Sequence, residues 1–217
     1  MSSAKKSCET AISLASSTGN TKQHPQGLRN LAWVEWYFGD YSAAQVHAIG
    51  AQRLAIISAD LYREAEALNI EAICCYTLGN YTKGMSLCIR ARELLSLCGI
   101  SHGQLDYTIM NAQAEIHRFK SEYVEARSIH NSILEGTTIQ DPYTYGFALL
   151  SVAETDVLIG ASKNDVQRNC DRARKMLDTV GDTTGVAVCD IILADVHMSE
   201  GNSLAAKRIL EDRKSVV

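Results

Sequence analysis

Apolar stretches of the chain end at short polar turns that recur about every 40 residues. Four of these turns are Gly39-Asp40-Tyr41, Gly79-Asn80-Tyr81, Ser121-Glu122-Tyr123 and Gly201-Asn202-Ser203. Three residues after the last member of each turn comes a small residue, in order Ala44, Gly84, Ala126 and Ala206. Recurrence at such a period is typical of repeat proteins, in which one structural unit is stacked on the next.

A second column of small residues lies seven positions before the first residue of each turn. It contains Ala32, Ala72, Ala114 and Ala194, and Ala153 when Gly160 is taken to open the fourth turn. A small residue at a fixed point of a helix lets a neighbouring helix approach closely, and two such columns indicate helical hairpins. The predicted hairpins are 26–59, 62–98, 103–135, 142–180 and 183–213, and a lone helix at 4–17 precedes them.

Length and composition favour one all-helical domain, residues 1–217. The only two prolines, Pro25 and Pro142, stand where a helix can begin. No apolar run approaches the roughly 18–20 residues of a membrane span, and the N-terminal segment does not read as a secretion signal. We therefore expect neither membrane anchoring nor secretion, and a cytoplasmic location.

Charge and cysteine usage argue against several classes of partner and cofactor. The net charge is −4, and the densest basic cluster is Arg168, Arg172, Arg174 and Lys175 on a segment that reads as a solvated outer helix. Nucleic-acid binding is not expected, because phosphate recognition needs a concentrated basic stripe.

The seven cysteines are an odd number without a C-x-x-C pair, which indicates reduced core residues and neither a metal site nor a cofactor.

The small columns, the Gly-Asp-Tyr or Gly-Asn-Tyr turns and the paired helices together resemble the tetratricopeptide repeat (TPR), in a version longer than the usual 34-residue unit. The longer form is similar to the arrays of kinesin light chains and of signal-transducing ATPases and fungal immune-receptor-like proteins. The resemblance implies a right-handed α-solenoid of about five hairpins plus one N-terminal helix. It also implies a concave groove lined by the first helix of each hairpin.

Under that resemblance the groove residues follow from their distance to the turn. The first three repeats supply Trp33, Trp36, Tyr37, Ile73, Tyr76, Glu115, Arg118 and Phe119. Glu154 and Asp195 come from the later repeats, and a further column holds Arg29, Asn69 and Asn111. Two readings stay open for the tryptophans, which either anchor a partner in the groove or pack in the core. The acidic residues either select a basic ligand or keep the groove hydrated.

We expect a non-catalytic protein-interaction module that binds a peptide or helix and could serve as the sensor or scaffold part of a larger signalling protein. The most enzyme-like column reads Glu35, Cys75, His117, Asp156 and His197. Successive repeats are displaced by roughly 10 Å per helix, so these side chains cannot converge on one reacting atom. The carboxylate clamp of TPR co-chaperones is not expected either, because the column of Arg29, Asn69 and Asn111 lacks its cationic ring.

Two further alternatives remain from the sequence. Neither end carries an evident polar capping helix, which free-standing solenoids need. The sequence therefore suggests a piece of a longer protein, or an array completed by self-association. An enzyme or a small-molecule binder is the remote alternative.

Overall fold

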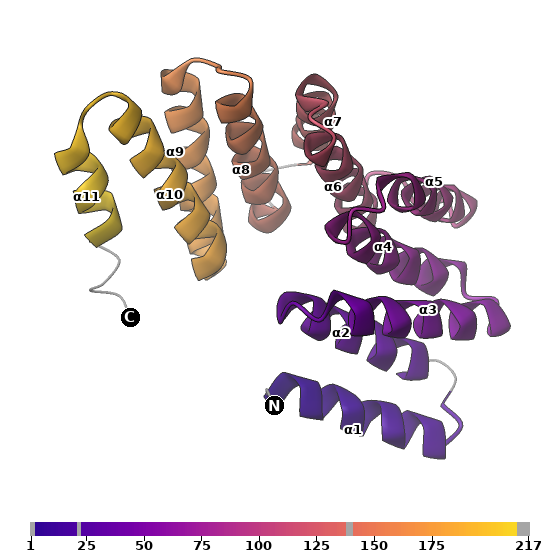
Figure 1. Cartoon of the computed structure of the whole chain (residues 1–217). Coiled ribbons are helices and arrows are strands. Elements are labelled where there is room, and N and C mark those ends of the chain that lie inside the picture. The colour runs from indigo at the N-terminus through magenta and orange to yellow at the C-terminus, as the bar shows by residue number, and fades with distance from the viewer. Residues whose placement is uncertain (1–2, 21–22, 138–140, 212–217) are drawn as a thin grey trace. The chain divides into compact units, whose positions relative to one another are not determined.

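The structure is a computed structural model that describes residues 3–20, 23–137 and 141–211. Within these ranges the chain forms eleven α-helices and no strand, which confirms the predicted all-α class. The helices are α1 (Ser3–Ser17), α2 (Gln23–Tyr37), α3 (Tyr41–Ile57), α4 (Leu61–Thr77), α5 (Tyr81–Leu97), α6 (Gln104–Phe119), α7 (Tyr123–Gly136), α8 (Pro142–Leu158), α9 (Lys163–Thr179), α10 (Thr183–Ser199) and α11 (Ser203–Glu211). Their order along the chain can be followed in Figure 1.

The helices start and end close to the predicted positions. The largest difference is at α2, which begins at Gln23 where the sequence predicts 26. Residues 212 and 213, the end of the fifth predicted hairpin, lie outside the described residues.

The chain divides into two compact units, Met1–Lys120 and Ser121–Val217, called unit 1 and unit 2 below. Unit 1 contains α1 to α6 and unit 2 contains α7 to α11. The two helices of the predicted hairpin 103–135 therefore belong to different units. That residues 1–217 form a single domain stays a prediction.

The recurrent turns have the geometry that their sequence requires. Gly39 and Gly79 adopt φ angles of +83° and +82°, in the left-handed region that glycine enters without a steric penalty. The next residue in each turn caps the following helix, because the side chain of Asp40 accepts a hydrogen bond from the Ala43 N–H and that of Asn80 from the Lys83 N–H. Glycine ends one helix and the polar residue begins the next.

The two columns of small residues meet inside the hairpins. Ala72 on α4 and Gly84 on α5 are both fully buried. A Cβ added at Gly84 would lie 3.2 Å from the Ala72 carbonyl oxygen, so this crossing leaves no room for a larger residue. The close approach inferred from the columns is therefore present in the second hairpin.

Even-numbered and odd-numbered helices form two layers in each unit. In unit 1, α2 contacts α4 and α4 contacts α6, whereas among the described residues α1 does not contact α3 and α3 does not contact α5. In unit 2, α8 contacts α10, and the described parts of α7, α9 and α11 do not contact one another. Because the even helices are closer together, each unit curves toward its even-helix side, which we call its inner face.

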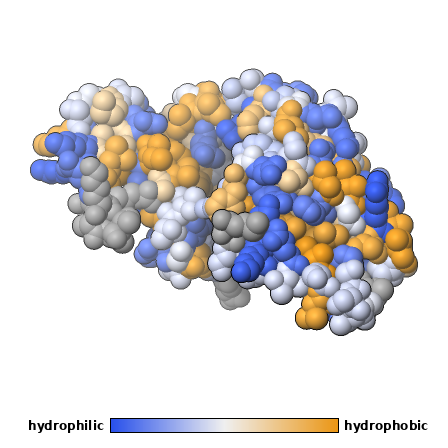
Figure 2. Space-filling view, turned by 60° about the horizontal axis from the view of Figure 1, so that its bottom comes forward, coloured by the Kyte–Doolittle hydropathy of each residue, from blue (hydrophilic) through white to orange (hydrophobic). Residues whose placement is uncertain are grey.

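Each unit has a hydrophobic core of its own. Leu68, Leu94 and Ile109 belong to the main core of unit 1, and Leu149 and Leu177 to that of unit 2. Apolar residues also remain on the surface, where they stand in patches among hydrophilic residues (Figure 2). None of the helices in the described ranges is both long and apolar enough to cross a bilayer.

The cysteines provide a test of the two cores. Burial raises the pKa of the thiols of Cys74, Cys88, Cys170 and Cys189 to about 12, whereas Cys98 is exposed. At pH 8 a thiol of pKa 12 is ionised in only about one molecule in 10,000, and the thiolate is the reactive form. We expect a thiol-specific alkylating reagent to modify Cys98 in the folded protein, and Cys74, Cys88, Cys170 and Cys189 only after unfolding. Peptide mass spectrometry checks this, and rapid labelling of Cys88 or Cys170 without denaturant would contradict the core packing.

Candidate functional site

The candidate residues of unit 1 come from three neighbouring helices of its inner face. The helix α2 carries Arg29, Trp33, Trp36 and Tyr37, α4 carries Asn69, Ile73 and Tyr76, and α6 carries Asn111, Glu115, Arg118 and Phe119. These helices are adjacent because α4 contacts both α2 and α6. The structure therefore brings these three groups onto one layer of one unit.

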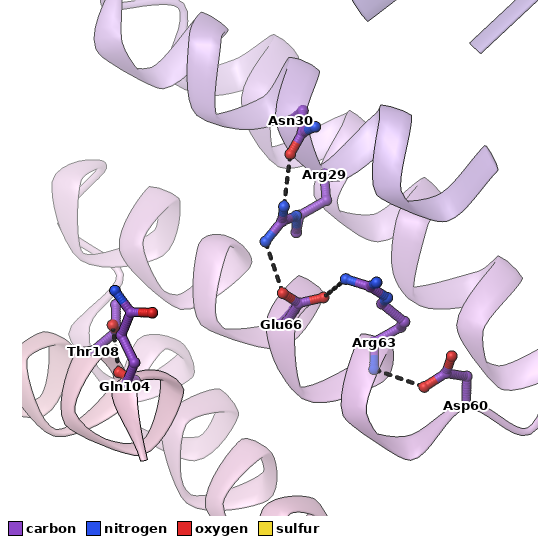
Figure 3. Close-up of polar contacts among 7 residues, drawn as sticks. All are labelled: Arg29, Asn30, Asp60, Arg63, Glu66, Gln104 and Thr108. Atoms are coloured by element: carbon purple, nitrogen blue, oxygen red, sulfur yellow. Dashed lines mark hydrogen bonds and ion pairs between the residues drawn. The ribbon is translucent and has the colours of Figure 1, made fainter. Parts of the chain in front are cut away.

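A buried carboxylate joins two arginines on this face. Arg29 Nη1 donates to Glu66 Oε1 at 2.7 Å, and Arg63 Nη1 donates to Glu66 Oε2 at 2.6 Å (Figure 3). The side chain of Glu66 is 9% exposed, whereas those of Arg29 and Arg63 are 24% and 30% exposed. Two guanidinium groups share the Glu66 carboxylate, and the Asp60 carboxylate lies beside Arg63.

Further contacts fix the positions of these two arginines. Arg29 Nη2 donates to Asn30 Oδ1 at 2.7 Å, and the Arg63 backbone N–H donates to Asp60 Oδ1 at 3.0 Å, which caps α4. An arginine held in place by its neighbours loses less conformational freedom when it binds a ligand.

The two tryptophans are half-buried and connect α2 to the core. Their rings meet edge to face with centroids 5.7 Å apart, and both pack against the buried clusters of unit 1. Trp36 Nε1 donates to Thr77 Oγ1 at 3.2 Å, which links α2 to α4. Each ring has a side in the core and a remainder in solvent, and that the tryptophans anchor a partner stays a prediction.

A second group of aromatic side chains lies where α4, α5 and α6 meet. The Phe119 ring stacks on Tyr81 with centroids 6.1 Å apart and lies 5.7 Å from Tyr76. Arg118 covers the same ring at 5.1 Å and donates from Nε to Glu115 Oε2 at 2.9 Å. Burial, followed by the nearby Glu115, raises the pKa of Tyr76 above its ordinary value. Glu115 is thus paired within the protein.

Three of the predicted groove residues, Asn69, Ile73 and Asn111, are less exposed than Tyr37. Tyr37 is 68% exposed, whereas Ile73 and Asn69 are 5% and 2% exposed. Ile73 belongs to the main core of unit 1, so it supports the inner face from beneath and does not line its surface. Asn111 is half-buried.

In unit 2 the candidate residues are acidic. Glu154 is half-buried on α8, and Asp195 is exposed on α10. Neither helix contains a lysine or an arginine. That these two residues continue one groove with those of unit 1 stays a prediction.

The two carboxylates of the enzyme-like column form ion pairs between helices. Glu35 on α2 is 3% exposed and contacts Lys5 Nζ at 3.0 Å and His47 Nδ1 at 2.6 Å. Asp156 on α8 is fully buried and pairs with Arg127 of α7. These carboxylates join neighbouring helices. Among the described residues, no group of three His, Cys, Asp or Glu side chains is placed to hold a metal ion.

The sequence analysis missed Glu66 and Arg63. Their three-residue spacing on α4 is a common pattern for a helical ion pair. Arg29, however, lies 37 residues before Glu66, close to one repeat length. Searching for opposite charges about one repeat apart on first helices would have found this contact.

Comparison with known proteins identifies the fold of the chain but finds no protein that is similar to it in sequence. No protein-family model matches the sequence, and no curated protein shows a significant sequence match. BtubC (BKLC) of P. vanneervenii is 14% identical, with a TM-score of 0.75 over 98% of this chain and 89% of that one. PlcR of Bacillus thuringiensis, solved in complex with the peptide PapR7 and DNA, is 11% identical, with a TM-score of 0.70 over 85% and 69%.

A third structure is the signal-transduction ATPase with a tetratricopeptide-repeat sensor from Pyrococcus horikoshii. It is 15% identical, with a TM-score of 0.57 over 97% of this chain and 36% of that one. The helical hairpins, the small-residue crossings and these similarities lead to the same result: the chain has the fold of the tetratricopeptide-repeat proteins.

Proposed function

We propose that the chain is a non-catalytic protein-interaction module, and that the inner face of unit 1 binds a peptide or helix of another protein. The observation that carries the proposal is the side-by-side placement of aromatic rings and paired arginines on α2, α4 and α6. Tyr37 is 68% exposed beside two half-buried tryptophans. Large aromatic rings held by a core are the residues that dominate binding at protein interfaces.

The charges favour a partner that carries acidic groups. Arg29 and Arg63 share the single carboxylate of Glu66, and Glu115 is neutralised by Arg118. Both arginines keep part of their side chains exposed, 24% and 30%, and can donate hydrogen bonds to an acidic group of a partner. The basic ligand that the sequence offered as one alternative fits this face less well.

The similar proteins add support of a general kind. PlcR was solved with a bound peptide, and it shares the helical arrangement with this chain. Tetratricopeptide arrays also recognise partners without changing them chemically. An enzyme is less consistent with the site, because its buried carboxylates are already used in ion pairs between helices.

The Tyr37→Ala variant tests the proposal. The full chain, immobilised, is exposed to an extract of the cells that express it, and retained proteins are identified and mapped to a bound segment. That segment is then synthesised as a fluorescent peptide. We expect its affinity, measured by anisotropy, to fall at least about tenfold in Tyr37→Ala, which corresponds to about 1.4 kcal/mol.

Leu78→Ala is the matched control, because Leu78 is 50% exposed but lies at a turn outside the candidate columns. Its affinity should equal that of the unchanged chain. Equal binding by all three proteins would contradict the proposed face. A chain that retains only copies of itself would favour self-association instead.

A further inference from the structure

Helix α3 of the outer layer has large apolar side chains on its solvent-exposed side, where a helix that packs only against its own chain normally has polar ones. The face of α3 that is buried in unit 1 consists of small residues, namely Ala44, Ala48, Ala51 and Ala55. Its larger apolar residues point away from that face. Val46, Ile56 and Ile57 are 65%, 54% and 79% exposed, and Ile49 is half-exposed.

These residues form one continuous stripe, which we call the outer stripe of α3. At 100° per residue, Val46, Ile49, Arg53, Ile56 and Ile57 fall within a sector of about 100°, opposite the alanines. From Val46 to Ile57 the stripe is about 16 Å long at a rise of 1.5 Å per residue. That length suits contact with three turns of another helix.

The next helix of the outer layer, α5, shares this feature only in part. Apart from His47, α3 has one charged side chain, Arg53, whereas α5 has four (Lys83, Arg90, Arg92 and Glu93). Val46 and Ile56 correspond to the polar residues Ser86 and Ser96 one repeat later, whereas Ile49 and Ile57 correspond to Ile89 and Leu97, which are 50% and 70% exposed. The apolar stripe is therefore continuous on α3 and interrupted by polar residues on α5.

Arg53 gives the stripe a positive charge that a ligand has to neutralise. It lies in the middle of the apolar residues, is exposed, and has no ion-pair partner among the described residues. A ligand that covers the stripe has to bring a carboxylate to this point, because covering a cation without a partner is costly.

A cleft borders one end of the stripe. It has a volume of about 440 Å³ and lies between the end of α1, His24 of α2, Leu54 and Ile57 of α3, and the following Ser58. Among the described residues that line it there is no lysine, arginine, aspartate or glutamate, and His24 is the titratable side chain. A large apolar side chain from a ligand on the stripe can enter it beside Ile57.

A second copy of the chain fits the stripe poorly. In an antiparallel pairing about the middle of the stripe, the two Arg53 residues would lie only about 4.5 Å apart along the helix axis. Like charges placed together at an interface disfavour that pairing. A bilayer surface fits no better, because helices that lie on membranes have several Lys or Arg residues beside their apolar face.

We propose that the outer stripe of α3 is a docking site for an amphipathic helix of another protein, whose apolar face carries a single carboxylate opposite Arg53. This site lies in the outer helix layer of unit 1 and is independent of the inner face. Binding there would leave the inner face free for its own partner.

Site-specific photocrosslinking tests this inference in the full chain. The photoreactive residue p-benzoylphenylalanine replaces Val46 in one variant and Ser86 in a matched control, and circular dichroism confirms that both are folded. After irradiation in an extract of the expressing cells, the cross-linked segment is sequenced by mass spectrometry. We expect a segment from another protein with helical apolar spacing and one Asp or Glu, at a yield at least about tenfold above the Ser86 control.

The charge requirement is tested in the same Val46 variant. Arg53→Glu should lower the yield about tenfold or more, whereas Arg53→Lys should keep most of it. A cross-link to the chain itself, a cross-link to lipid, a yield equal to the Ser86 control, or a yield unaffected by Arg53→Glu would each overturn the proposal.

Discussion

The Arg127→Met variant is expected to unfold with a free energy about 3 kcal/mol lower than that of the unchanged chain. Arg127 of α7 is the ion-pair partner of Asp156, whose side chain is 0% exposed on α8. Without the guanidinium, the buried carboxylate would keep one side-chain partner among the described residues, Asn169 Nδ2 at 3.5 Å. Removing one partner of a buried pair costs about 3–5 kcal/mol. The lower end applies because the Arg127 side chain is 40% exposed.

Urea unfolding followed by circular dichroism measures this effect. Arg168→Met is the matched control, because Arg168 pairs with Asp165 where both side chains are exposed, and such pairs contribute about 0–1 kcal/mol. Adding Asp156→Asn to Arg127→Met should restore part of the loss, since it removes the buried charge. Equal stability of the Arg127 and Arg168 variants would show that the Asp156 pair does not hold α7 against α8.

Leu177→Ala is the second change with a large expected effect, a loss of about 3–4 kcal/mol. Leu177 on α9 is fully buried between two glycines of the neighbouring helices. A Cβ added at Gly146 of α8 would lie 2.9 Å from Leu177 Cγ, and one added at Gly185 of α10 would lie 2.7 Å from Leu177 Cδ1. Three helices therefore converge on this side chain, and its removal leaves a cavity among all of them.

The same glycines make the prediction specific. Gly146→Ala alone should cost about 1–3 kcal/mol, because the new methyl group overlaps Leu177. In the Leu177→Ala background the Leu177 atoms at 2.9 and 3.0 Å are gone and only the Met176 Cβ contact at 3.1 Å remains. Because alanine is also a better helix former than glycine, Gly146→Ala should cost less there than in the unchanged chain. Denaturant unfolding of the four proteins gives the coupling. A Gly146→Ala effect that is the same in both backgrounds would contradict the described packing.

The fold could be predicted because its signals are local. The turn at Gly39 and the cap at Asp40 are fixed by residues within one or two turns of helix, and the spacing to Gly79 repeats them. The alanine columns, such as Ala72, mark where helices cross. None of these inferences needs the position of a distant side chain.

The candidate site was predicted less completely because exposure depends on neighbouring helices. Counting back from the turn gave Trp33 and Ile73 the same position, yet Trp33 is half-exposed and Ile73 is in the core. Glu66 was missed because its role depends on Arg29, one helix pair away. The outward-facing Ile57 was also missed, since an apolar residue on a helix is ordinarily assigned to the core.

The neighbour-to-neighbour packing of the helices has a consequence for how the chain forms its structure. Trp36 and Thr77, which link α2 to α4, are 41 residues apart, so a helix meets its next-layer partner after about one repeat of chain. At a synthesis rate of about 5–20 residues per second, that partner emerges from the ribosome within roughly 2–8 seconds. Contacts over such short stretches of chain also close quickly. The earlier helices of unit 1 can therefore be assembled while the later ones are still being translated.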